Sequence, residues 1–228
     1  MKKIITTISF SFLLALGIVN SSSAISLEGL SIGISASHGG FYAEGTEKEE
    51  LKDTGVDDTT EAGAFTANFG SIFVEYNLGP ISFGVDYIPS TIETPKNTNI
   101  QGTSTNTVKG EFENLTTLYA IVPVPFLGGL YLKAGGIYVD LNSVETLETG
   151  GSYGNTDTTG ITAGLGYAVE AADGISIRAE VTASQYDSVS LTNSGVNADA
   201  LTQDDQDTVI TLDEMMSARA TISVVKSF

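Results

Sequence analysis

Apolar and polar residues alternate along most of the chain with a period of two, which is the spacing of a β-strand with one apolar face. The clearest stretch runs from Ile175 to Ser184, where Ile, Ala and Val alternate with Ser, Arg, Glu and Thr. The stretch that ends in Pro123 and Pro125 alternates poorly, and a closed sheet tolerates these prolines only at a strand end. The pattern predicts eight strands, at residues 30–42, 65–78, 81–88, 111–125, 130–141, 159–170, 175–184 and 209–228.

The connections between these strands also alternate, between short and long. Three are tight turns, at Gly79-Pro80, Leu127–Gly129 and Ala172–Gly174. Four are long polar stretches, at about residues 44–64, 91–110, 142–158 and 188–208. Short periplasmic turns and long extracellular loops are typical of outer-membrane barrels. We therefore expect an all-β fold, an eight-stranded antiparallel up-and-down transmembrane β-barrel over residues 25–228. A soluble barrel or sandwich would alternate equally well, but the asymmetry of the connections favours the membrane barrel.

Aromatic residues fall near the predicted strand ends. Such positions are typical of the two interfacial girdles of a membrane barrel, although the chain has no Trp. The girdle on the loop side would comprise Phe41, Tyr42, Phe65, Tyr87, Phe112, Tyr138 and Tyr186, and the girdle on the turn side Tyr76, Phe126, Tyr131, Tyr167 and Phe228.

The first residues have the pattern of a secretory signal peptide. Met1-Lys2-Lys3 is basic, residues 4–19 are apolar, and Ser22 and Ala24 occupy the small-residue positions of a cleavage site. The alternative is an uncleaved membrane helix, for which the apolar run is too short. We expect a cleaved signal peptide at residues 1–24 and an integral protein of the cell outer membrane.

Charge and composition exclude several classes of function. The formal net charge is −18, so the protein should repel nucleic acid. The chain has no Cys, no phosphate-binding glycine loop and no His/Cys cluster, so we expect no cofactor.

The last strand ends in a terminal aromatic residue after alternating apolar positions, at Ile222, Val224 and Phe228. This ending resembles the C-terminal assembly signal of outer-membrane proteins, although Lys226 stands where an apolar residue is usual. Together with the expected signal peptide and the number of predicted strands, this ending makes the chain resemble the OmpA/OmpX-type superfamily of small barrels, including porin-family and opacity-protein-like barrels of Proteobacteria. The resemblance implies a Gram-negative cell envelope, outer-membrane lipid as the surroundings, and periplasmic chaperones and the barrel assembly machinery as biogenesis partners. We expect a monomer.

Charged residues on the predicted inner faces are the main candidates for a functional site. An eight-stranded barrel is just wide enough for side chains to fill it, and charges buried there must pair. Glu180 with Arg219 is one such expected pair. The network is interpreted either as a gate whose ion pairs exchange to open a narrow pore or as a static polar core. Its members are Glu75, Asp86, Lys133, Arg178, Glu180 and Arg219.

The acidic loops are weaker candidates. Asp204, Asp205 and Asp207 offer ligands of the type that divalent cations prefer. The stretch lacks the Gly and Glu spacing of an EF-hand, so the simpler interpretation is a solvated loop.

Catalysis has little support, because the only histidine is His38 and no Ser motif lies around it. We therefore expect no enzyme; a lipid A-modifying hydrolase is the remaining enzymatic alternative. The leading function is a structural or porin-like outer-membrane barrel. One alternative is an OmpW-like conduit for small hydrophobic solutes, against which the predicted charges in the lumen argue. Another is an adhesin or surface-recognition protein that acts through its loops.

Overall fold

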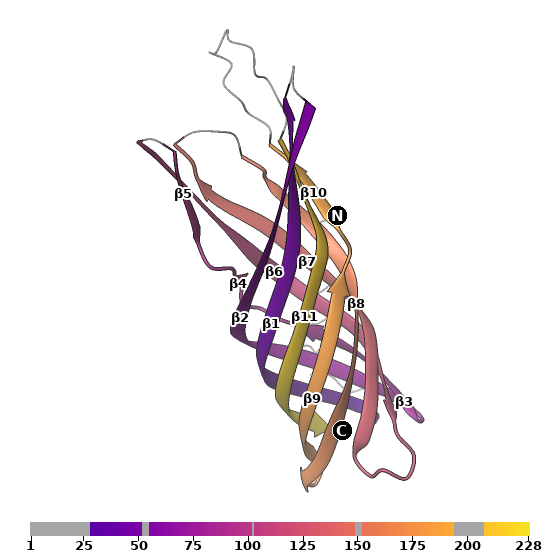
Figure 1. The fold of residues 1–228 in the computed structure, drawn as a ribbon. Coiled ribbons are helices and arrows are strands. Elements are labelled where there is room, and N and C mark those ends of the chain that lie inside the picture. The colour runs from indigo at the N-terminus through magenta and orange to yellow at the C-terminus, as the bar shows by residue number, and fades with distance from the viewer. Residues whose placement is uncertain (1–27, 52–54, 102, 149–151, 194–207) are drawn as a thin grey trace, which may run out of the picture.

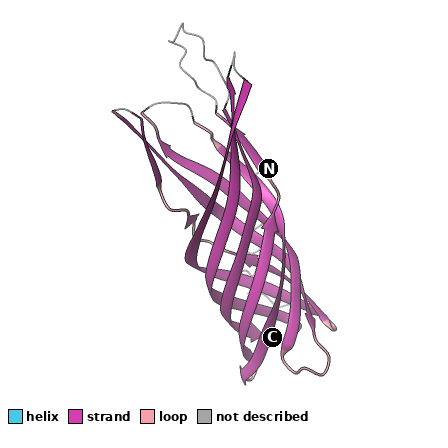
Figure 2. Cartoon of the chain, in the orientation of Figure 1, coloured by secondary structure: helices cyan, strands magenta, loops and turns pink. Residues whose placement is uncertain are grey.

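A computed structural model describes residues 28–51, 55–101, 103–148, 152–193 and 208–228. Eight of its strands form a closed antiparallel ring in chain order, and three short strands attach to that ring (Figures 1 and 2). The ring strands are β1 (Leu30–Leu51), β2 (Gly55–Leu78), β3 (Ile81–Tyr87), β6 (Ser104–Pro123), β7 (Leu130–Thr146), β8 (Asn155–Ala172), β9 (Ile175–Tyr186) and β11 (Thr208–Ser227), and the short ones are β4 (Ile92–Glu93), β5 (Asn97–Gln101) and β10 (Val189–Thr192). The expected up-and-down barrel is confirmed. The described residues contain no helix that is long and apolar enough to cross a membrane.

The strands are staggered around the ring. A path across hydrogen-bonded neighbours that starts at Ile32 on β1 returns to β1 at Tyr42, ten residues further along. The path passes through Val74, Val85, Leu118, Gly136, Ile161, Gln185 and Met216. Strand number and stagger together determine the tilt and width of a barrel, and eight tilted strands leave an interior that side chains fill.

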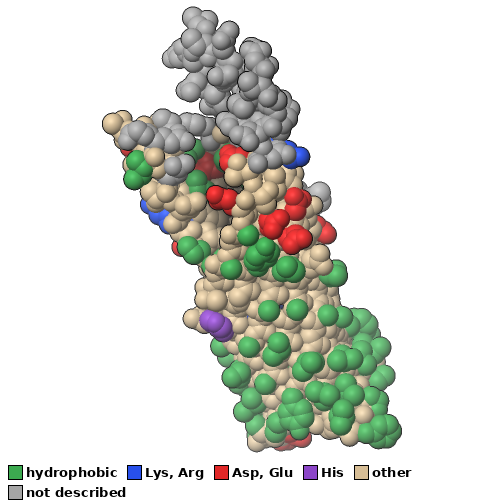
Figure 3. Space-filling view, in the orientation of Figure 1, with side chains coloured by type: hydrophobic (Ala, Val, Ile, Leu, Met, Phe, Trp, Pro, Cys, Tyr) green, Lys and Arg blue, Asp and Glu red, His purple; other side chains and the backbone are tan. Residues whose placement is uncertain are grey.

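The period of two places apolar side chains on the outside of the barrel. Alternate residues of each strand point outward, and many of them are large apolar residues that are more than one third exposed. Figure 3 shows these side chains gathered over the lower half of the barrel, with acidic residues above them. Members of this apolar belt include Ile34, Ile72, Phe83, Leu118, Leu132, Ile161, Leu165, Val181 and Ile222.

Three tight turns join strands at the lower end of the barrel in Figure 1, which we call the turn end. They lie where the sequence predicts them. Gly79, Gly129 and Gly174 adopt positive φ angles of 67°, 88° and 65°, a conformation that glycine adopts without strain. The non-glycine Phe126 also has a positive φ, of 67°, in the turn that follows Pro123 at the end of β6.

At the opposite, upper end the strands continue through most of the predicted long loops. In place of a loop at 44–64, β1 runs to Leu51 and β2 begins at Gly55, with the two paired throughout. The predicted loop at 91–110 contains β4, β5 and the start of β6, and the predicted loop at 142–158 contains the end of β7 and the start of β8. At 188–208, β10 pairs with β11. Strand pairing thus extends into the predicted loop stretches because backbone pairing does not need an apolar face, and the hydroxyls of Thr46 and Thr60 hydrogen-bond across the strands.

Candidate functional site

The six charges predicted for the lumen all point into the barrel, most of them toward the turn end. Glu75, Lys133 and Arg178 each lie three residues from the turn-end limit of their strand. Glu75, Asp86, Lys133 and Glu180 are at most 9% exposed, and the side chains of Arg178 and Arg219 are 16% and 13% exposed. Three acids therefore meet three bases in a confined space, and the layer is formally neutral.

The first ion pair joins opposite walls of the barrel. Arg178 Nη1 on β9 donates to Glu75 Oε1 on β2 at 2.7 Å, and Tyr119 Oη donates to the same oxygen at 2.8 Å. The Arg178 guanidinium also lies 5.9 Å from the ring centroid of Phe73 and 5.8 Å from that of Tyr131. Glu75 is thus held by a charged and a neutral donor.

A second pair lies beside the first and is linked to it by tyrosines. Lys133 Nζ on β7 donates to Glu180 Oε1 on β9 at 2.9 Å, and Tyr131 Oη donates to Glu180 Oε2 at 3.2 Å. Lys133 Nζ also sits 4.0 Å from the ring centroid of Tyr119, the donor to Glu75. The two pairs form one connected network across the lumen.

The third pair is looser. Arg219 Nη2 on β11 lies 3.5 Å from Asp86 Oδ2 on β3, and Arg219 Nε donates to Thr182 Oγ1 at 3.2 Å. Glu180 is thus paired with Lys133 and not, as the sequence suggested, with Arg219. Within this network, the carboxylate oxygens Glu75 Oε2 and Asp86 Oδ1 are buried without a hydrogen-bond partner.

Glycines make room for the tyrosines of this network. A Cβ built on Gly166 would lie 2.2 Å from Tyr131 Cζ, and one built on Gly84 would lie 2.5 Å from Tyr119 Cζ. Each glycine therefore faces the body of a buried ring, and the ring fills the space that a side chain would occupy.

Gly166→Ala is accordingly expected to lower the free energy of unfolding by about 1–3 kcal/mol, because the added methyl displaces Tyr131 from its bond to Glu180. Gly40→Ala is the matched control, since a Cβ there meets nothing within 4 Å. Urea unfolding of the two refolded variants checks the difference. Equal midpoints would contradict the assigned close packing.

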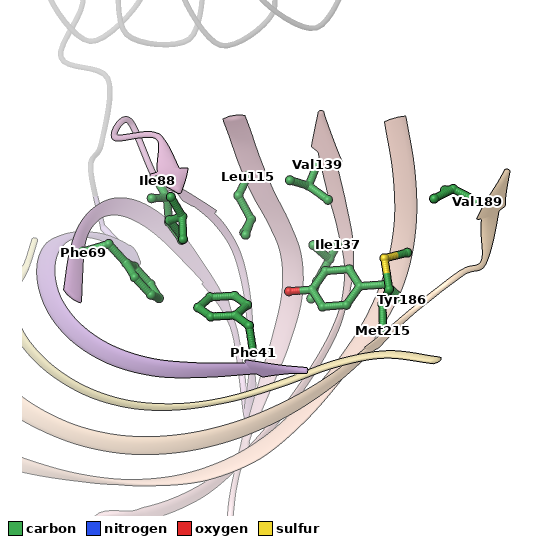
Figure 4. Packing of buried hydrophobic residues seen from close by; sticks show 10 residues of the cluster. Phe41, Phe69, Ile88, Leu115, Ile137, Val139, Tyr186, Val189 and Met215 are labelled. Carbon is green, nitrogen blue, oxygen red and sulfur yellow. The ribbon is translucent and has the colours of Figure 1, made fainter. Parts of the chain in front are cut away.

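Above the charges, the lumen is filled by an apolar cluster. Phe41, Phe69, Ile88, Leu115, Ile137, Tyr186 and Met215 are among its buried members, with Phe65 and Phe112 packed against them (Figure 4). The rings of Phe41 and Phe65 stack at a centroid distance of 4.9 Å. The interior therefore has two layers, a charged layer toward the turn end and an apolar layer toward the upper end.

This apolar layer corrects part of the predicted girdles. Phe41, Phe65, Phe112 and Tyr186 were expected at the membrane interface and instead point into the lumen, as does Tyr131 on the turn side. The sequence already indicated the inward orientation of most of these aromatic residues. Phe41 and Phe65 lie an even number of residues from inward residues of their strands, Ser37 and Glu75 respectively. Residues at such spacings point to the same face of a strand.

His38 points outward, into the apolar belt. Its Nδ1 donates to Asn68 Oδ1 at 2.8 Å, and the pair is exposed on the outer wall. Among the described residues, neither a Ser nor a carboxylate bonds to this imidazole, so the arrangement of a hydrolytic triad is not formed there.

Metal ligands are not assembled in the part of the chain that the structure describes, where no group of three His, Asp or Glu side chains could hold an ion. The candidates Asp204, Asp205 and Asp207 lie outside the described residues, as does the expected signal peptide at 1–24.

The predicted assembly signal lies on the outer face of the last strand. Ile222, Val224 and Phe228 are 64%, 49% and 52% exposed, and the backbone N–H of Phe228 donates to the carbonyl of Leu30 at 2.9 Å. Lys226, the departure from the usual signal, donates from its Nζ to the carbonyl of Asp173 at 3.2 Å. The lysine is therefore accommodated at the turn end.

Above the belt, Tyr153 connects the chain between β7 and β8 to β1. Its Oη donates to Glu47 Oε1 at 3.3 Å, and burial, with the charge of Glu47, raises the pKa of Tyr153 to about 12. Because the folded protein holds this proton more tightly, the phenol's contribution to stability is present below its ordinary pKa of 10.0 and is lost as the pH rises toward 12. We expect Tyr153→Phe to remove one tyrosinate transition near pH 12 from a near-ultraviolet pH titration. An unchanged titration would contradict the contact.

No protein-family model and no curated protein matches the chain. Among solved structures, Neisserial surface protein A aligns with 88% of this chain and 98% of its own, at 13% identity and a TM-score of 0.40. The outer membrane protease OmpT of Escherichia coli aligns with 92% and 99%, at 8% identity and 0.42, and CarO2 of Acinetobacter baumannii with 82% and 98%, at 13% and 0.32. At such low identities and scores, these likenesses transfer no activity, ligand or partner to the chain.

Proposed function

We propose that the chain is an integral outer-membrane barrel with a closed lumen and a structural role in the envelope. The apolar belt carries this proposal. A continuous ring of exposed Ile, Leu, Val and aromatic side chains is far larger than the apolar patches of soluble proteins. In a bilayer the same residues face hydrocarbon, and the closed ring leaves every wall strand paired at the level of the turns.

Polar groups bound the belt. Toward the upper end of β1, Tyr42 is followed by Glu44, which pairs with Glu214 on β11. At the opposite end, Lys226 lies near the lower end of β11. Glu214 and Lys226 lie twelve residues apart on β11, and at about 3.3 Å per residue and a strand tilt of about 45° this stretch spans about 28 Å of height, close to the ~25 Å of an outer-membrane apolar band. The predicted leader and terminal Phe228 agree with export and insertion from the periplasmic side.

The two interior layers favour the static interpretation of the lumen over the gated one. The charged layer is paired across the barrel, and an apolar cluster of buried side chains packs above it. An ion would have to break the pairs and then cross an apolar plug, so a pore has no continuous polar path.

The refolded mature chain is therefore expected to show no steady conductance in planar bilayers. Arg178→Ala and Arg219→Ala should remain silent, because neither change opens the apolar layer. Heat-modifiable migration in gels establishes that each sample is folded. Discrete openings of the wild-type chain would contradict the closed lumen and restore the porin-like interpretation.

Surface recognition is the second candidate, and one observation favours it. Above Glu44 the β1–β2 pair continues as a ribbon to Leu51 and Gly55, and β5 with β6 forms another that projects beside it (Figure 1). These ribbons present ordered backbone and side chains beyond the belt.

Deletion of residues 46–60 should leave the barrel folded and abolish binding to any cell surface that the intact protein recognises; unchanged binding would reject this role.

A further inference from the structure

Beside β2, the described wall of the barrel has an interval without backbone pairing. β2 pairs with β3 only from Ile72 to Leu78, and above Ile72 the described part of the chain offers β2 no partner except β1. The segment that follows β3 turns to β6 instead: the N–H of Ile88 donates to the carbonyl of Leu115 at 3.0 Å, and Ile92 pairs with Phe112. We call the interval between β2 residues 62–71 and residues 88–93 the seam. In Figure 1, β1 and β2 rise away from β4, β5 and β6 above it.

Apolar side chains close the seam. Phe69 from β2 and Ile88 and Ile92 from the opposite margin belong to the apolar cluster and are 8%, 1% and 2% exposed. Figure 4 shows Phe69 and Ile88 on the same side of the cluster. Along the paired stretches of the wall, such as β1 with β2 or β6 with β7, separating two strands breaks a ladder of hydrogen bonds. At the seam it breaks only apolar contacts, which another apolar group can replace.

The lower part of the seam lies at the depth of the belt. Asn68 faces His38, and His38 faces Ala220 on β11. Above Ala220, the outward residues Ala218 and Met216 still precede the first carboxylate of β11, Glu214. An opening beside Asn68 would therefore face lipid hydrocarbon.

Polar groups flank the seam on its outer side. On the β2 margin, His38 and Asn68 form an exposed hydrogen-bonded pair, with Ala220 opposite His38 on β11. On the other margin, Tyr87 Oη donates to Asn114 Oδ1 at 3.2 Å, and Asn114 Nδ2 donates to Asp140 at 2.8 Å. Polar side chains on a lipid-facing wall are costly unless they meet a polar partner. Here the polar side chains meet one another, and the ester carbonyls of a lipid at this depth are acceptors for further N–H groups of the two asparagine amides.

From these observations we propose that the seam admits an acyl chain of an outer-leaflet membrane lipid into the apolar upper lumen, while the flanking polar groups hold the ester region of that lipid. The charged layer below, beginning with Arg219 and Asp86, stops the chain from passing deeper, so the site binds and does not conduct. This inference rests on the proposed placement in the membrane.

The absence of Trp from the sequence allows a direct test with single-Trp reporters. Phe69→Trp places the reporter behind the seam. Tyr186→Trp is the matched interior control, because Tyr186 is also 8% exposed and its strand is paired on both sides, with Gly160 and Met215. Phe83→Trp reports from the outer wall, where Phe83 is 51% exposed.

The three variants are refolded into phosphatidylcholine vesicles with dibrominated acyl chains, which quench Trp on contact. The quenching of Phe69→Trp is expected to approach that of Phe83→Trp and to exceed that of Tyr186→Trp several-fold. Ile88→Ala, added to Phe69→Trp, should increase quenching further because it weakens the closure. If Phe69→Trp fails to fold, as judged by heat-modifiable migration, Phe65→Trp takes its place.

The outcomes separate the two proposals. If Phe69→Trp and Tyr186→Trp are quenched equally weakly while Phe83→Trp is strongly quenched, the barrel is in the membrane and the seam proposal is overturned. Weak quenching of Phe83→Trp would overturn the membrane placement and the seam together. Quenching of Phe69→Trp by free dibrominated fatty acid, without quenching by the brominated phospholipid, would overturn a membrane lipid as the occupant.

Discussion

Arg178→Ala is expected to lower the free energy of unfolding by about 3–5 kcal/mol, because it leaves a buried carboxylate without its charged partner. Glu75 is 2% exposed, one of its oxygens already has no hydrogen-bond partner, and the other would keep only the hydroxyl of Tyr119. Urea unfolding of the chain refolded in phospholipid vesicles measures the change.

Two comparisons identify the cause. Lys109→Ala removes an ion pair with Glu93 and Glu111 at the upper end, where water screens the charges, and should change stability little. Glu75→Gln combined with Arg178→Met should recover much of the loss, because no unpaired charge remains buried. A loss from Arg178→Ala no larger than that from Lys109→Ala would show that the network contributes little.

The second large effect is expected on the outside of the barrel. Leu165→Arg places a cation in the middle of the apolar belt, where Leu165 is 55% exposed and faces Val181. If this surface lies in hydrocarbon, the substitution should cost about 2–4 kcal/mol of folding free energy in a bilayer. Reversible urea unfolding in vesicles gives the value.

Ala62→Arg is the control for that experiment. Ala62 is exposed on β2 and faces Glu44, beyond the upper limit of the belt, so a cation there stays in water. A small effect of Ala62→Arg beside a large effect of Leu165→Arg would support the membrane placement. Equal, small effects at both positions would instead favour a soluble barrel.

The closed lumen and the seam assign different roles to the two interior layers. Under the proposed function, the charged layer joins strands across the barrel and blocks passage, as a static core does. The apolar layer also adds to the core, but it borders the seam, where β2 lacks backbone pairing on one side. In the sequence, the predicted lumen charges argued against a conduit for hydrophobic solutes. Because the upper layer of the lumen is apolar, this argument applies only to the lower half of the lumen.

Much of the fold followed from the sequence. The period of two identified the wall strands except the poorly alternating one that ends at Pro123, the turn residues placed the three tight connections, and the alternation of each strand placed the six charges inside. These features are local, because alternate residues of an extended chain point to opposite faces wherever the strand lies. The order of the strands around the barrel could also be predicted from the sequence, because tight turns force neighbouring strands to pair.

Only the tertiary structure decided what meets inside the barrel. Parity places Glu180 and Arg219 in the lumen, yet Glu180 pairs with Lys133 and Arg219 with Asp86. The height of a side chain relative to those on other strands depends on the ten-residue stagger accumulated around the ring. The same stagger gathers Phe41, Phe69 and Ile88 into one layer, and the early end of β3 leaves the seam beside them. The stagger cannot be predicted from the sequence of a single strand, because the stagger arises from the registers of eight pairings together.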